Sequence, residues 1–159
     1  MTSRSAIGLS LAEVLVALAV LGLLASLGVA AARPSPEGRA ASALRSLLLQ
    51  ARAEALWSGS PAAVVELPGG GGFAALRSRL GEPGCEAGET LAAVRLRDFP
   101  RVAVVQGLWS GGLYWLPTGS GRDCTGGGVV SGTVVLRGPR GTASVVVSSL
   151  GRVRVEAGP

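Results

Sequence analysis

The sequence predicts an α+β fold in which a long N-terminal helix packs on a C-terminal antiparallel β-sheet domain. Three observations predict it. Residues 8–32 form an apolar stretch with a single charged residue, Glu13. Residues 37–58 are rich in Ala, Leu and Arg, which favour helices. From residue 62 onward, short β-rich runs alternate with Gly-rich turns, as in an antiparallel sheet.

The apolar stretch is long enough to cross a membrane as a helix. It runs for 24 residues from Leu9, and a bilayer takes about 20. Upstream lies only the polar octapeptide MTSRSAIG, whose one cationic side chain is Arg4. A secretory signal would have a shorter apolar core followed by a small-residue cleavage site. Here the polarity changes before the apolar run, so cleavage between Gly8 and Leu9 would leave the membrane helix on the mature chain.

Glu13 is the unusual residue of this stretch, because a carboxylate in a membrane helix costs about 2.5–3.5 kcal/mol at the bilayer centre. Cleavage after Gly8 would create a partner, the α-amino group of Leu9. Five residues of helix span about 7.5 Å, so Glu13 reaches the amine of its own chain poorly. A neighbouring subunit could present its amine directly. The alternative is an interfacial glutamate whose carboxylate extends to the lipid headgroups.

The segment GLSLAEVLVALAVLGLLASLGV resembles the class III signal and N-terminal helix of type IV pilins and type II secretion pseudopilins. Gly8, Leu9, Ser10, Leu11 and Glu13 fit the family pattern position by position, with Leu9 in place of the usual Phe. The resemblance implies cleavage after Gly8 and N-methylation of Leu9 by a prepilin peptidase. It also implies that Glu13 pairs with a neighbour's N-terminus during assembly.

A second, amphipathic helix is expected over residues 37–58. Ser35 is a suitable cap and Pro36 suits the first helical position. Apolar residues recur at three-to-four spacing and form one stripe, whereas the charged residues fall mostly outside it. The stripe consists of Ala41, Leu44, Leu47, Leu48, Ala51, Ala55 and Leu56. Gly59-Ser60-Pro61 ends the helix.

Eight strands are expected in the remaining chain. They are Ala62–Leu67, Phe73–Ser78, Leu91–Arg97, Val102–Gln106, Leu113–Leu116, Gly132–Arg137, Ala143–Ser148 and Arg152–Glu156. Residues 118–128 are expected to form a polar loop. Turns at 137–141 and 148–151 predict that the last three strands form consecutive hairpins. In the last strand, Arg152 and Arg154 share one face about 7 Å apart.

The two cysteines, Cys85 and Cys124, are expected to form one disulfide in an exported domain. The alternative is a pair of free thiols. A bridge closing a loop of about 40 residues stabilises by roughly 3–4 kcal/mol.

The residue composition excludes several kinds of enzyme. Lys and Arg together number 15 and all are Arg, against 10 acidic residues, which gives a net charge of +5. There is no His, which removes Ser–His–Asp catalysis and most zinc sites. The only aspartates, Asp98 and Asp123, are not paired by any motif. We therefore expect no catalysis, no cofactor and no metal.

The downstream sequence resembles GspH/FimT-type minor pilins. The segments that carry this resemblance are ARAEALWSGSPAAVVEL, YWLPTG, GTVVL, SVVV and LGRVR. It implies a leader (1–8), a membrane and assembly helix (9–32), an amphipathic helix continuing into the head (33–58) and a β-rich head (59–159). It also implies an inner-membrane protein with a periplasmic head, which joins other pilins in a pilus or pseudopilus.

The segment Gly151-Arg-Val-Arg154 matches a Gly-Arg-x-Arg motif with which some FimT-like pilins bind DNA. Guanidinium groups bind phosphates in a salt-sensitive, sequence-independent way, so Arg152 and Arg154 are candidate DNA contacts. The alternative is a solvated edge strand in which the arginines prevent edge-to-edge pairing. Arg137 and Arg140 are expected at the opposite end of the hairpin, so they do not extend this pair into one patch.

Overall fold

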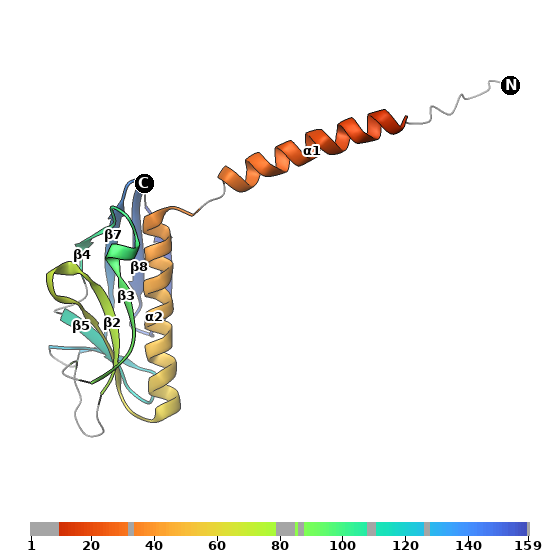
Figure 1. Ribbon diagram of the computed structural model, residues 1–159. Coiled ribbons are helices and arrows are strands. Elements are labelled where there is room, and N and C mark those ends of the chain that lie inside the picture. The colour runs from red at the N-terminus through yellow and green to blue at the C-terminus, as the bar shows by residue number, and fades with distance from the viewer. Residues whose placement is uncertain are drawn as a thin grey trace. The chain divides into compact units, whose positions relative to one another are not determined.

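The computed structural model describes residues 10–31, 34–78, 85, 88–107, 111–125 and 128–158. The chain divides into two compact units, Met1–Pro34 and Ser35–Pro159. The first contains helix α1 (Leu11–Ala31). The second, called the head below, contains helix α2 (Pro36–Ser58) and nine described strands (Figure 1).

Helix α1 confirms that residues of the apolar stretch are helical. It is 21 residues long, and its side chains from Leu11 to Leu24 are exposed. No helix among the described residues combines the length and the apolarity that a membrane span requires.

Helix α2 begins and ends where the sequence predicts, because a local capping signal marks each of its ends. The Ser35 side chain accepts a hydrogen bond of 3.1 Å from the backbone N–H of Gly38, and Pro36 occupies the first turn. Gly59 ends the helix in the left-handed conformation, with φ of 69°. The buried face of α2 follows the predicted stripe for most of its length, but Leu56 is exposed.

The head contains two antiparallel sheets, which confirms the expected antiparallel β-sheet domain. One has the strand order β3-β2-β1-β5-β6 and the other the order β4-β7-β8-β9. The bounds are β1 Ala62–Glu66, β2 Gly72–Arg77, β3 Glu89–Arg95, β4 Ala103–Gln106, β5 Gly112–Trp115, β6 Gly121–Asp123, β7 Gly132–Gly138, β8 Gly141–Val147 and β9 Val153–Ala157. All eight expected strands are confirmed within a few residues. β6 lies inside the expected loop and was missed.

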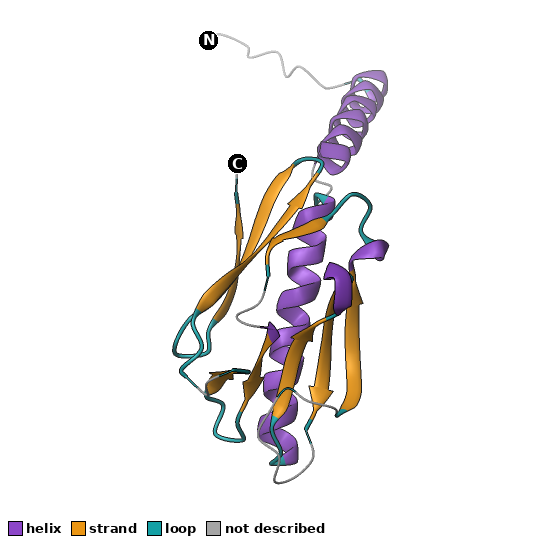
Figure 2. Cartoon of the chain, turned by 90° about the vertical axis from the view of Figure 1, so that its left-hand side faces the viewer, coloured by secondary structure: helices purple, strands orange, loops and turns teal. Residues whose placement is uncertain are grey.

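Both sheets pack against α2, which runs along the two groups of strands (Figure 2). Leu44 and Leu48 of the helix share one continuous core with Phe73 and Trp115 of the first sheet and Val145 of the second. Each fully buried Leu or Phe contributes about 1.5–3 kcal/mol of transfer free energy. The helix therefore joins two sheets that have no strand pairing between them in the described residues.

Candidate functional site

The predicted processing site, Gly8 and Leu9, lies outside the described residues. Glu13 lies in the first turn of α1, where its Oε2 accepts a hydrogen bond of 3.3 Å from the Ser10 backbone N–H. In return, the Ser10 hydroxyl accepts one of 3.2 Å from the Glu13 backbone N–H. This reciprocal pair is a capping box. The Ser-x-x-Glu spacing could have revealed it in the sequence.

Cys85 and Cys124 are joined by a disulfide, with their Cα atoms 5.6 Å apart. The backbone N–H of Cys124, just after β6, also donates to the carbonyl of Gly112 at 3.2 Å. The bridge therefore ties the end of β6 and its partner β5 to the segment between β2 and β3. The predicted pairing is present.

Arg152 lies just before β9 and Arg154 is the second residue of that strand, and both side chains are exposed. Arg154 Nε pairs with Glu156 Oε1 at 2.8 Å, and their side chains are 70% and 50% exposed. An exposed pair of this kind contributes about 0–1 kcal/mol, so an incoming anion can displace the carboxylate. Arg137 lies at the far end of β7, which pairs with β8. The structure therefore keeps these arginines apart, as predicted.

A groove of about 580 Å³ lies beside the two β9 arginines, between α2 and the β8–β9 hairpin. Its lining mixes apolar and cationic side chains. The lining residues are Leu49, Arg52, Val146, Ser148, Leu150, Gly151, Arg152, Val153 and Arg154. An anion that also presents an apolar surface fits this combination of side chains.

Arg52 of α2 is one of the three arginines that line the groove. One terminal nitrogen, Nη1, donates to the carbonyl of Gly151 at 2.9 Å, and the guanidinium carbon lies 5.5 Å from the centroid of the Trp115 ring. Its buried Nε has no hydrogen-bond partner among the described atoms. Sequence reasoning missed Arg52 as part of the site, because its partners Trp115 and Gly151 lie far away in the chain, Gly151 at a separation of 99 residues.

A second arginine of α2 repeats this contact two turns earlier. Arg45 Nε donates to the carbonyl of Val153 at 3.4 Å. Arg45 and Arg52 are seven residues apart and lie on one helix face. Through these two arginines, α2 donates hydrogen bonds to the carbonyls of Val153, at the start of β9, and Gly151, just before it. An edge strand covered in this way is protected from pairing with another chain on that side.

Gly151 is the glycine of the Gly-Arg-Val-Arg segment, and its place in the turn requires glycine. Its φ is 75°, in the left-handed region, and an added Cβ would lie 3.0 Å from Trp115 and 3.5 Å from Arg52. The turn from β8 into β9 therefore approaches the core closely. This approach positions Arg152 at the mouth of the groove.

Among solved structures, the chain is similar to the minor pseudopilin EpsH of the type 2 secretion system of Vibrio cholerae. Identity is 14%, the TM-score is 0.53, and the match covers 77% of this chain and 98% of that one.

The chain is also similar to the type IV minor pilin FimU of Pseudomonas aeruginosa in two crystal forms. Identity is 18% in both, with TM-scores of 0.54 and 0.56. The matches cover 74% and 76% of this chain and 90% and 87% of FimU. A comparison with protein-family models found no match, and neither did a comparison with curated protein sequences. The structural similarity establishes a pilin-like fold.

Proposed function

We propose that the chain is a minor pilin or pseudopilin, processed by a prepilin peptidase and built into a type IV pilus or a type II secretion pseudopilus. One observation supports this most strongly: a head with the pilin-like fold follows an apolar helix whose first turn contains Glu13. The similar structures are a secretion pseudopilin and a pilus minor pilin. In this role the chain is structural and needs no cofactor.

Processing in this proposal occurs between Gly8 and Leu9, followed by N-methylation of Leu9. α1 then holds the chain in the inner membrane, with the head in the periplasm, until the subunit is extracted into the fibre. The described α1 side chains are all exposed, which suits a helix that lies in lipid first and packs among sister helices later.

Glu13 has a defined role in the assembly step. Among the described residues, the one hydrogen bond to its carboxylate is the long 3.3 Å bond from the Ser10 backbone N–H. The charged amine of a neighbour's Leu9 is a stronger partner than a backbone N–H, because it adds the attraction of a full opposite charge to the hydrogen bond. The capping bond therefore holds the carboxylate at the helix start until a neighbouring amine replaces it.

Three substitutions separate capping from assembly. Glu13→Gln keeps a side chain that can complete the capping box but removes the charge, so we expect normal membrane insertion and little or no incorporation into fibres. Glu13→Ala removes both functions and should also fail to assemble. Ser10→Ala, the control, costs about 1 kcal/mol of helix capping but keeps the carboxylate, so it should still assemble.

The readout is the amount of each variant in sheared fibres relative to membranes. Incorporation of Glu13→Gln at the level of the unmodified chain would contradict the assembly role. If Ser10→Ala also fails to enter fibres, the assembly defect comes from the lost cap at the start of α1 and not from the lost charge of Glu13.

A second candidate function, DNA binding for natural transformation, is favoured by the exposure of Arg152 and Arg154 beside the groove that contains Arg52. Two guanidinium groups about 7 Å apart along a strand can contact successive phosphates. The apolar lining of the groove would then face the sugar. Such binding would be independent of sequence and sensitive to salt.

The test uses the head from Ser35, which keeps the cap of α2. We expect the head to retard duplex DNA in a gel. The double variant Arg152→Ala with Arg154→Ala should reduce the steepness with which the logarithm of the binding constant falls with the logarithm of the salt concentration by about two, one for each lost phosphate contact. The matched control is Arg137→Ala with Arg140→Ala at the other end of the hairpin. Unchanged retardation by the first pair would exclude those residues as the DNA contacts.

A further inference from the structure

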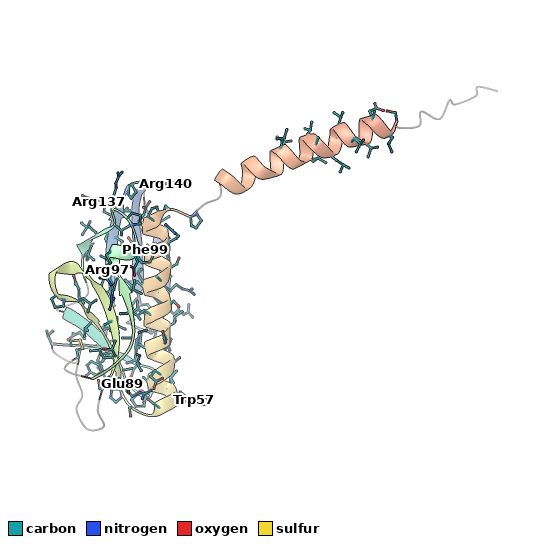
Figure 3. The ribbon with its side chains drawn as sticks, viewed as in Figure 1. Trp57, Glu89, Arg97, Phe99, Arg137 and Arg140 are labelled. Atoms are coloured by element: carbon teal, nitrogen blue, oxygen red, sulfur yellow. A yellow bond between two sulfur atoms is a disulfide. The ribbon has the colours of Figure 1, made fainter. Side chains whose placement is uncertain are left out.

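Two arginines flank the β7–β8 turn at the end of the head where α2 begins (Figure 3). Arg137 and Arg140 lie on either side of Gly138, which pairs with Gly141, and both side chains are exposed. The turn lies directly against the first turn of α2, since a Cβ added to Gly138 would collide with the Glu37 carboxylate. Chain segments a hundred residues apart therefore meet at this end.

A third arginine reaches the same end with a strained backbone. Arg101 lies just before Ala103, the residue that pairs with Arg137 across β4 and β7. It occupies the third position of a turn closed by the bond from Val102 N–H to Phe99 O, with φ of 61°. It is the one non-glycine residue with positive φ among the described residues. Glycine is the usual residue at such a position, so an exposed arginine there indicates a function of its side chain.

Arg39, exposed in the first turns of α2, completes a cationic surface that we call the basic end: Arg39, Arg101, Arg137 and Arg140. The two acids closest to these arginines along the chain offset only part of their charge. Glu37 is buried, with 3% of its surface exposed, and Asp98 lies 3.9 Å from Arg97. The basic end therefore presents a net positive field to the solvent.

We propose that the basic end binds the headgroups of anionic phospholipids. The inference rests on the proposed function, in which α1 lies in the membrane. α2 starts at Pro36 and α1 ends at Ala31, a difference of five residues, which span at most about 18 Å. The basic end thus lies within reach of the bilayer surface, where anionic lipids attract cationic side chains and guanidinium groups bind phosphate in bidentate fashion.

The test measures partitioning of the head, from Ser35, onto vesicles. The described core residues all lie in this unit, so it is expected to fold without α1. We expect binding to phosphatidylcholine vesicles that contain about one quarter phosphatidylglycerol, and none to phosphatidylcholine alone. Arg101→Gly should lower partitioning about fivefold, and adding Arg137→Gln about fivefold more.

Arg101→Gly makes the test sharp, because glycine adopts the observed φ without strain. Its melting temperature should therefore stay the same or rise while lipid binding falls. The matched control is Arg152→Gln with Arg154→Gln, which removes two arginines at the far end of β8, about 20 Å away, and should leave partitioning within twofold.

Three results would overturn the inference. They are equal binding to both kinds of vesicle, unchanged partitioning of Arg101→Gly with Arg137→Gln, and an equal loss in the Arg152 and Arg154 control. If the double variant keeps lipid binding but fails to join other pilins, the basic end faces a neighbouring subunit instead. Because the assay omits α1, failure here leaves the processing and assembly of the full chain untouched.

Discussion

At the residue scale, Arg52 connects the parts of the head that the proposed DNA site needs. It projects from α2, bonds the carbonyl of Gly151 and lies over Trp115. Its charge thus supports the turn that presents Arg152, and it lines the groove as well. Arg45 makes a similar but longer bond of 3.4 Å from an exposed position.

These two arginines give a prediction with an internal control. Arg52→Ala leaves the Gly151 carbonyl without its charged donor and uncovers Trp115, so it should lower the free energy of unfolding by about 1.5–3 kcal/mol. Arg45→Ala removes a longer bond made by an exposed side chain and should cost less than about 1 kcal/mol. Urea unfolding of the head, followed by tryptophan fluorescence, measures both. Equal losses would show that Arg52 has no special role in supporting the turn.

At the element scale, the sequence predicts best those elements whose signals are local. α2 could be placed because a serine cap, a proline and a final glycine mark its ends and an apolar stripe marks its buried face. The strands from β7 to β9 could be placed because apolar residues alternate along them between clear turns. The capping box at Ser10 and Glu13 has an equally local signal, the Ser-x-x-Glu spacing.

β6 could not be predicted, for a physical reason. Gly121–Asp123 has no apolar alternation and lies among glycines and polar residues. It is a strand because it pairs with β5, and Gly121 fits there because an added Cβ would lie 2.9 Å from Trp115. The groove could not be predicted for a different reason, because it forms only where α2 and β9 meet, and these segments lie about a hundred residues apart in the chain.

At the scale of the whole molecule, the division of the strands into two sheets gives the small head several separate surfaces. α2 provides one apolar face to both sheets, so the strands need not form one continuous sheet. The β9 arginines and the basic end then lie at opposite ends of the second sheet. We propose different partners for these two ends: DNA for the first and the membrane surface for the second.

The central claim is that α1 enters a fibre after a peptidase has exposed its N-terminus. The most direct measurement is the N-terminal sequence and intact mass of the mature chain, isolated from membranes of a host that contains a prepilin peptidase. We predict that the chain begins at Leu9, with the mass of one added methyl group. A chain that retains Met1, or that begins beyond Ala32, would contradict the account.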